Sequence, residues 1–361
     1  MLAPRAFLAL AVVALLGGCA SPGGQPDAVS AASSSSAAPT AAAVDTIESV
    51  QPGPLIDLDC SDFAAVAGIG MLRGVTERDP RGVSFDLFEK VPVADIVRNA
   101  GGIACEFSDG GLWRLPDDSG RELNESWHGA AIFVVPNAAV AEATVFPVDE
   151  CGDSTTSARY TVCSWHFTAG GAWIHIVVST NDRRETIFAV RDLVTATVAA
   201  AVSTPGPIPR PEGTFDPPHE CSALMDAAAV GVALGATDIT ADRAIEIESE
   251  ADASYFTENT GCLWYVDSLP HALEVLVYPG GAWAASLSLP SLGASPVTLA
   301  GLGEGTAASH CTAVPQWGYA MCTVEVVVAG TWFRAIGTAE TEADAATIAI
   351  AAAEAVLRHR E

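Results

Sequence analysis

The sequence predicts an α+β fold built from two tandem repeats of one disulfide-bearing unit. The first observation is that residues 160–178 and 319–336 match. Each stretch has a cysteine, alternating apolar residues, a turn containing glycine and then a tryptophan, as in a β-hairpin. The second observation is the cysteine spacing, because four cysteines recur at nearly one offset. The separations are 161 for Cys60 and Cys221, 157 for Cys105 and Cys262, 160 for Cys151 and Cys311, and 159 for Cys163 and Cys322. Each unit should have an antiparallel sheet of about four or five strands, with helices on one face.

The amino terminus has the pattern of an export signal. Residues 1–5 carry one positive charge, and residues 6–16 are apolar but too short to span a bilayer. Leu16-Gly17-Gly18-Cys19 then resembles the bacterial lipobox, which implies cleavage after residue 18 and lipid attachment to the Cys19 thiol. The alternative is an ordinary secretory signal that ends in cysteine. We expect residues 1–18 to be a lipoprotein signal peptide, with the protein anchored at the extracytoplasmic face of the cell membrane.

A low-complexity tether and a first folded unit follow. Residues 19–49 are mostly Ser, Ala, Pro and Thr, which predicts disorder because such a segment cannot bury a core. The first unit should span residues 50–203. Its expected elements are helices at 63–72 and 91–99, strands at 103–107 and 130–135, a helix at 137–145, the hairpin, and a helix at 182–202.

The second unit should repeat this order over residues 220–361, after a proline-rich linker at 204–219. Its expected elements are a helix at 222–234, strands at 261–265 and 271–278, the second hairpin, and a closing helix at 341–358 with Thr341 and Asp344 at capping-box spacing. The segments around 110–125 and 280–305 have no counterpart in the other unit. Function could therefore have diverged there.

The eight cysteines after Cys19 should form disulfides, because an exported protein with an even set rarely leaves them free. Four cysteines in each unit allow three connectivities. We favour two bonds within each unit on grounds of locality: Cys60–Cys105, Cys151–Cys163, Cys221–Cys262 and Cys311–Cys322. Metal ligation would need clustered Cys or His motifs, which the sequence lacks.

The charge limits the kinds of partner. The formal net charge is −27 and the only lysine is Lys90, so we expect no nucleic-acid partner. Such a surface suits basic partners, cations or solubility. An acidic run is expected to form a solvated face, with a cation site as the alternative. It consists of Glu246, Glu248, Glu250 and Asp252.

Motifs for catalysis and cofactor binding are missing, so we predict no catalytic or cofactor-binding residues. His166 and His175 should lie opposite each other across the hairpin, where they could hold a metal or sense pH. The second copy has Glu325 and Arg334 at these positions. Ordinary polar pairing on an outer, solvent-facing face therefore explains both pairs better. Trp173 and Trp332 fall on this same face, and we expect them to be buried under a helix.

In each unit, a cysteine at the head of a helix is followed by a second cysteine in a short strand, Cys105-Glu106-Phe107 or Cys262-Leu263-Trp264. With the lipobox and tether, this pattern resembles a family of actinobacterial cell-envelope lipoproteins of unknown function. The resemblance implies location and fold type, not activity. We expect a non-catalytic monomer, held on the membrane through Cys19, that binds a small ligand or an envelope protein. The alternatives are an envelope hydrolase with its site in the unmatched loops, and a purely structural protein.

Overall fold

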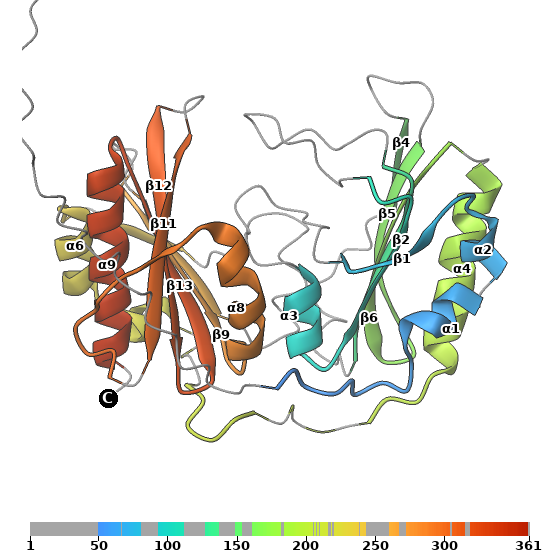
Figure 1. The fold of residues 1–361 in the computed structure, drawn as a ribbon, viewed down its shortest axis with the longest axis horizontal. Coiled ribbons are helices and arrows are strands. Elements are labelled where there is room, and N and C mark those ends of the chain that lie inside the picture. The colour runs from blue at the N-terminus through green and yellow to red at the C-terminus, as the bar shows by residue number, and fades with distance from the viewer. Residues whose placement is uncertain are drawn as a thin grey trace, which may run out of the picture. The chain divides into compact units, whose positions relative to one another are not determined.

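Two antiparallel β-sheets with helices packed against them form an α+β fold in the computed structural model (Figure 1). The chain from residue 44 to 361 is one compact unit that contains both sheets. The structure describes residues 50–80, 93–111, 127–136, 149–153, 161–181, 184–242, 260–266, 272–314 and 318–359, apart from positions 66, 205, 207, 209, 216, 217, 219, 238 and 304.

The first sheet has six strands in the order β1-β2-β3-β6-β5-β4. Its centre is the predicted hairpin, which turns at Gly170 and Gly171, both with positive φ. The strands are β1 (Thr76–Arg78), β2 (Ile103–Ser108), β3 (Gly129–Val135), β4 (Asp149–Asp153), β5 (Thr161–Ala169) and β6 (Ala172–Thr180).

The second sheet has seven strands in the order β10-β11-β12-β13-β9-β8-β7. Read from β7, the first six strands reproduce the order of the first sheet, and β10 is added at the far edge. This shared order is what the cysteine spacing predicted. The strands are β7 (Thr240–Asp242), β8 (Thr260–Tyr265), β9 (Ala272–Tyr278), β10 (Ser295–Pro296), β11 (Thr306–Val314), β12 (Tyr319–Val328) and β13 (Thr331–Ala339).

One long helix packs on each sheet, and we call the face that it covers the long-helix face. In the first sheet this helix is α4 (Arg184–Ala200), which packs on β5 and β6 beside α1 (Cys60–Ala65) and α2 (Ala67–Met71). In the second sheet it is α9 (Glu342–His359), which packs on β12 and β13. The α9 contact surface is rich in alanine, so the helix can lie close to the sheet.

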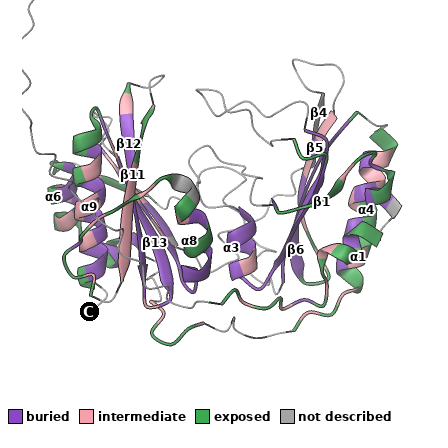
Figure 2. Ribbon diagram, viewed as in Figure 1, coloured by how far each residue is buried: buried purple, intermediate pink, exposed green. Residues whose placement is uncertain are grey.

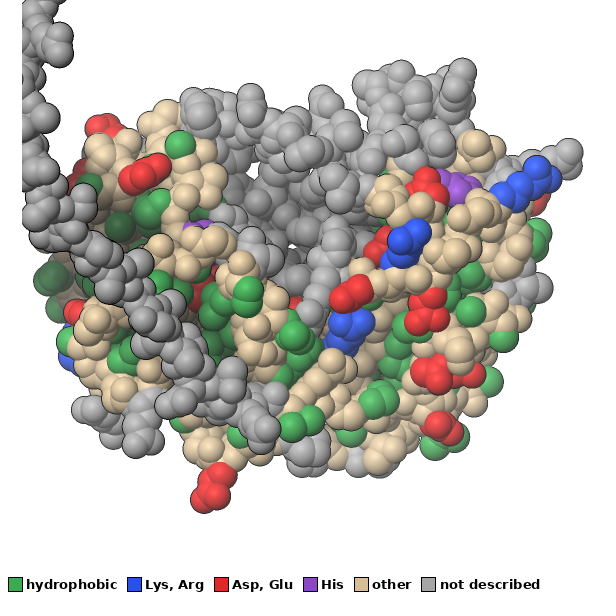
Figure 3. Space-filling model, viewed as in Figure 1, with side chains coloured by type: hydrophobic (Ala, Val, Ile, Leu, Met, Phe, Trp, Pro, Cys, Tyr) green, Lys and Arg blue, Asp and Glu red, His purple; other side chains and the backbone are tan. Residues whose placement is uncertain are grey.

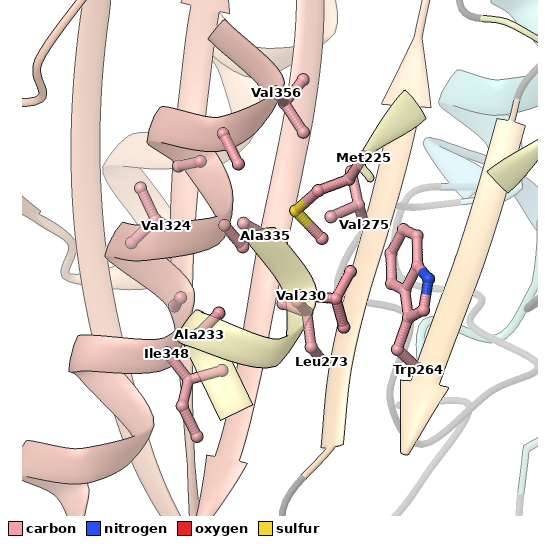
Figure 4. Close-up of a cluster of buried hydrophobic side chains, with 14 of the residues drawn as sticks. Met225, Val230, Ala233, Trp264, Leu273, Val275, Val324, Ala335, Ile348 and Val356 are labelled. Atoms are coloured by element: carbon pink, nitrogen blue, oxygen red, sulfur yellow. The ribbon is translucent and has the colours of Figure 1, made fainter. Parts of the chain in front are cut away.

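Figure 4 shows the core under α9, with Ile348 and Val356 from the helix near Val324 and Ala335 from the sheet. Two short helices complete this layer, α5 (Cys221–Leu224) and α6 (Ala227–Leu234). The sequence predicted one continuous helix here. The helix breaks because the Asp226 side chain accepts a hydrogen bond from the Ala229 amide at 2.7 Å and caps a new helix start.

Two further predictions about the sheets were wrong. Helices do not lie on one face only, because α3 (Val93–Asn99) and α8 (Ala282–Ser288) pack on the opposite face, which we call the inner face. Figure 2 shows α3 buried over nearly its whole surface, whereas α4 exposes one side. The sheets also have more strands than expected, because the segments around Cys151 and Cys311, where no strand was predicted, form β4 and β11.

The inner faces of the two sheets share one hydrophobic cluster, to which α3 and α8 both contribute. Asn99 at the end of α3 connects them by polar contacts. Its Nδ2 donates to the Pro279 carbonyl at 2.8 Å, and its Oδ1 accepts from the Trp283 indole at 3.2 Å. The two sheets are therefore joined by specific contacts as well as by the chain that runs between them.

Three of the predicted disulfides are present, namely Cys60–Cys105, Cys221–Cys262 and Cys311–Cys322. Cys163 is also disulfide-bonded, and the β4–β5 register places the backbone of Cys151 directly opposite it. The Cys151 side chain lies outside the described residues, so the fourth bond stays a prediction.

Several predictions fall outside the part of the chain that the structure describes. They are the lipid site at Cys19, the signal peptide, the tether, the helix at 137–145 and the acidic run. Among the described helices, none is both long and apolar enough to cross a membrane.

Candidate functional site

Polar side chains gather at the same place on the inner face of both sheets. The cross-strand pairing predicted from the sequence is correct, since His166 lies opposite His175 and Glu325 lies opposite Arg334. The prediction that these pairs face solvent was wrong. All four side chains are buried on the inner face, the face on which α3 and α8 also pack.

In the first sheet the polar pair consists of two histidines, one of which contacts a neighbouring hydroxyl. The rings of His166 and His175 lie 3.8 Å apart between centroids, and Ser164 Oγ lies 3.1 Å from His175 Nε2. Burial lowers the pKa of His175 well below its ordinary value, and the neighbouring His166 lowers it further. The imidazole of His175 is therefore kept uncharged at neutral pH.

In the second sheet the equivalent pair is charged. Arg334 Nε donates to Glu325 Oε1 at 3.1 Å, and the Trp332 indole donates to Glu325 Oε2 at 2.9 Å. Both Glu325 oxygens therefore have a donor. Desolvation alone would lower the pKa of Arg334, but the Glu325 carboxylate, with Tyr278 and Glu274, outweighs it and raises that pKa. Arg334 is thus charged at every physiological pH.

Arg334 has hydrogen-bonding capacity that the described residues do not use. Its Nη1 and Nη2 are buried without a hydrogen-bond partner in the described part of the chain, and so is Thr323 Oγ1. Thr323 precedes Glu325 by two residues on β12, so it lies on the same face, diagonal to Arg334. In the first sheet its equivalent, Ser164, contacts His175. We call Thr323, Glu325 and Arg334 the β12–β13 polar cluster.

The strands around this cluster are less covered than the cluster itself. On β8, β9 and β11 the inner-face side chains are only half-buried: Leu263, Glu274, Leu276, Ala308 and His310. The other end of the inner face is packed against α8, where Trp332 and Tyr278 are buried. Trp173 is buried on the first sheet as well, so the prediction for both tryptophans is confirmed. The cluster therefore lies between a packed end and a partly accessible end of the sheet.

The chemistry available at the cluster is hydrogen-bond donation rather than metal binding. Among the described residues, no group of three or more His, Cys, Asp or Glu is placed to hold a metal ion. The histidine pair of the first sheet offers two ligands at most, which is too few for a closed site. By contrast, a guanidinium with two unoccupied nitrogens and a hydroxyl can hold acceptor oxygens.

On the face in Figure 3, acidic, basic and apolar side chains are interspersed. Sequence reasoning paired Glu325 with Arg334 but placed the pair on a solvent-facing surface, and it did not include Thr323, which looks like an ordinary strand residue. The one available signal was the change from His166 and His175 to an acid and a base in the second copy. Comparison of the chain with protein-family models, curated proteins and solved structures found no match.

Proposed function

We propose that this chain is a lipid-anchored, extracytoplasmic and non-catalytic binding protein whose ligand contacts the inner face of the second sheet. The observation that carries the binding role is the buried guanidinium of Arg334, whose Nη1 and Nη2 have no partner among the described residues. Burying unpaired donors costs about 1–3 kcal/mol for each group, and more for charged groups. A ligand that supplies acceptors would remove this cost.

The location rests on two features. Leu16-Gly17-Gly18-Cys19 has the form of a lipidation site, and three disulfides are typical of an oxidising compartment. We also propose that the fold arose by tandem duplication, with two disulfides in each copy. The common strand order of the two sheets and the β4–β5 register at Cys151 support this.

Ligand binding can be tested with the full chain carrying Cys19→Ala, purified under oxidising conditions. A library of small polar compounds is screened by thermal unfolding, because specific binding raises apparent stability. Hits should lose their effect in Arg334→Met and keep it in Arg358→Met, which removes an exposed arginine of the same sheet's helix. Hits that act equally on both variants would contradict a site at Arg334.

Lipid anchoring has its own test. The wild-type chain expressed in a bacterium that processes lipoproteins should fractionate with membranes, and its mature amino terminus should be a diacylated Cys19. The Cys19→Ala variant should leave the membrane fraction. Wild-type protein in the soluble fraction with an unmodified Cys19 would refute the anchor without affecting the binding proposal.

A further inference from the structure

We propose that Arg334 and Thr323 bind an uncharged oxygen acceptor, such as an amide carbonyl, rather than a carboxylate or a phosphate. This choice rests on the proposed function and specifies its ligand class. A free arginine fork would ordinarily suggest an anion, because it fits a carboxylate with two parallel hydrogen bonds. The surroundings of this arginine argue against that assignment.

The charge of Arg334 is already balanced inside the protein. Its Nε lies 3.1 Å from Glu325 Oε1, and both side chains are almost completely buried. A bound anion would place a second negative charge beside one positive charge where little solvent screens the repulsion. An uncharged acceptor keeps the ion pair neutral and still satisfies the Nη donors.

Further negative charge lies around the ion pair. The half-buried Glu274 on β9 is close enough to act on the charge of Arg334. Over the whole chain the net charge of −27 lowers the local concentration of anions at the surface. Both the near and the distant charges therefore disfavour an anionic ligand.

The unoccupied hydrogen-bonding atoms suit an amide. Arg334 Nη1 and Nη2 can only donate, so they require an acceptor oxygen. Thr323 Oγ1 can donate or accept, so it can also pair with an amide N–H. Glu325 cannot serve as the acceptor for this N–H as readily, because its two oxygens already receive bonds from Arg334 and Trp332. Leu263 and Leu276 beside the cluster would contact the apolar part of the ligand.

The test compares propionamide with propionate, which have nearly the same shape and differ in charge. The full chain with Cys19→Ala is labelled with 15N-arginine, and the Arg334 side-chain signals are assigned by their loss in Arg334→Lys. Both compounds are titrated at constant ionic strength while these signals are followed. Arg358 and the other arginines serve as internal controls in the same spectra.

We expect propionamide to shift the Arg334 signals. Propionate should need at least about a tenfold higher concentration for the same shift, which corresponds to a difference in binding free energy of about 1.4 kcal/mol. Thr323→Val should weaken the propionamide response and leave the other arginine signals unchanged. A shift of Arg334 at equal or lower concentrations of propionate would overturn the assignment of an uncharged ligand while leaving a binding site at Arg334. No shift with either compound would count against the binding site itself.

Discussion

Equivalent positions on the inner faces of the two sheets are occupied by different polar pairs. The first sheet has His166 and His175. Ser164 contacts His175, and the two imidazole rings pack against each other. The second has Glu325 and Arg334, an ion pair that still leaves two guanidinium nitrogens without a partner among the described residues. The neighbouring hydroxyl differs as well: Ser164 contacts His175, whereas Thr323 Oγ1 has no hydrogen-bond partner in the described part of the chain.

This difference is the reason to place the proposed ligand on the second sheet. A neutral pair can be buried at small cost once it is hydrogen-bonded, whereas a buried ion pair has to overcome the desolvation of two charges. Charged residues on an inner face therefore need a reason beyond stability. Because the two sheets share their strand order, a role in folding alone would not explain why a buried ion pair occupies this position only in the second sheet.

The largest effect on stability should come from removing one charge of the ion pair in the second sheet. Glu325→Gln leaves Arg334 buried without a counter-charge and should lower the free energy of unfolding by about 3–5 kcal/mol. The double variant Glu325→His with Arg334→His copies the first sheet and should be more stable than Glu325→Gln. Denaturant unfolding with the disulfides intact measures both. If Glu325→Gln had the same free energy of unfolding as wild type, the ion pair would contribute nothing to stability. The proposed difference between the two sheets would then be wrong.

The disulfides should contribute similarly in the two halves. Cys60–Cys105 and Cys221–Cys262 join residues 45 and 41 apart, so replacing either pair by alanine should cost about 4 kcal/mol. Cys311–Cys322 closes a separation of only 11 residues and should contribute about 3 kcal/mol. Unfolding midpoints of the three double-alanine variants give this ranking. A reversed order would show that strain in the folded state, rather than loop length, controls the contribution.

A smaller effect should appear at the two hairpin turns. Gly170 and Ala329 occupy equivalent turn positions and both have positive φ, at 61° and 48°. Gly170→Ala should destabilise by about 1–2 kcal/mol, because the backbone is strained for alanine and the added Cβ would lie 2.9 Å from Ala199 Cα. Ala329→Gly should change stability by less than about 1 kcal/mol, since relief of strain offsets the lost methyl contact. Equal responses at the two turns would contradict this asymmetry.

The smallest expected effect is a pH dependence that belongs to the first sheet. Burial keeps the pKa of folded His175 well below the ordinary value of 6.5, so the unfolded chain takes up a proton first as the pH falls. Stability should therefore decrease as the pH falls below about 6.5, and level off once the folded protein is also protonated. His175→Gln should reduce this dependence between pH 7.5 and 5.5 in denaturant unfolding. An unchanged pH profile in His175→Gln would show that a group other than His175 causes the pH dependence.

Local features of the chain were enough to predict the repeated framework. The alternating residues of the two hairpins fixed which side chains share a face, so His166, His175, Glu325 and Arg334 were paired correctly. Locality in the chain favoured the disulfide pairings, of which three are present. The helical periodicity of residues 182–202 likewise indicated the long helix that covers the first sheet. These signals survive in sequence because they depend on short-range periodicity and spacing.

Only the tertiary structure decided whether the second face of each sheet is exposed or buried. Residues 93–99 and 282–288 carry no signal that they cross to the inner face, because burial there depends on contacts such as Asn99 with Trp283, which are distant in sequence. Burial of this face turns an ordinary surface ion pair into a desolvated one and leaves Arg334 with buried donors that have no partner among the described residues. The sequence determined which strand residues lie opposite each other. Tertiary packing of the inner face determined how deeply those pairs are buried, and therefore the free energy of desolvating them.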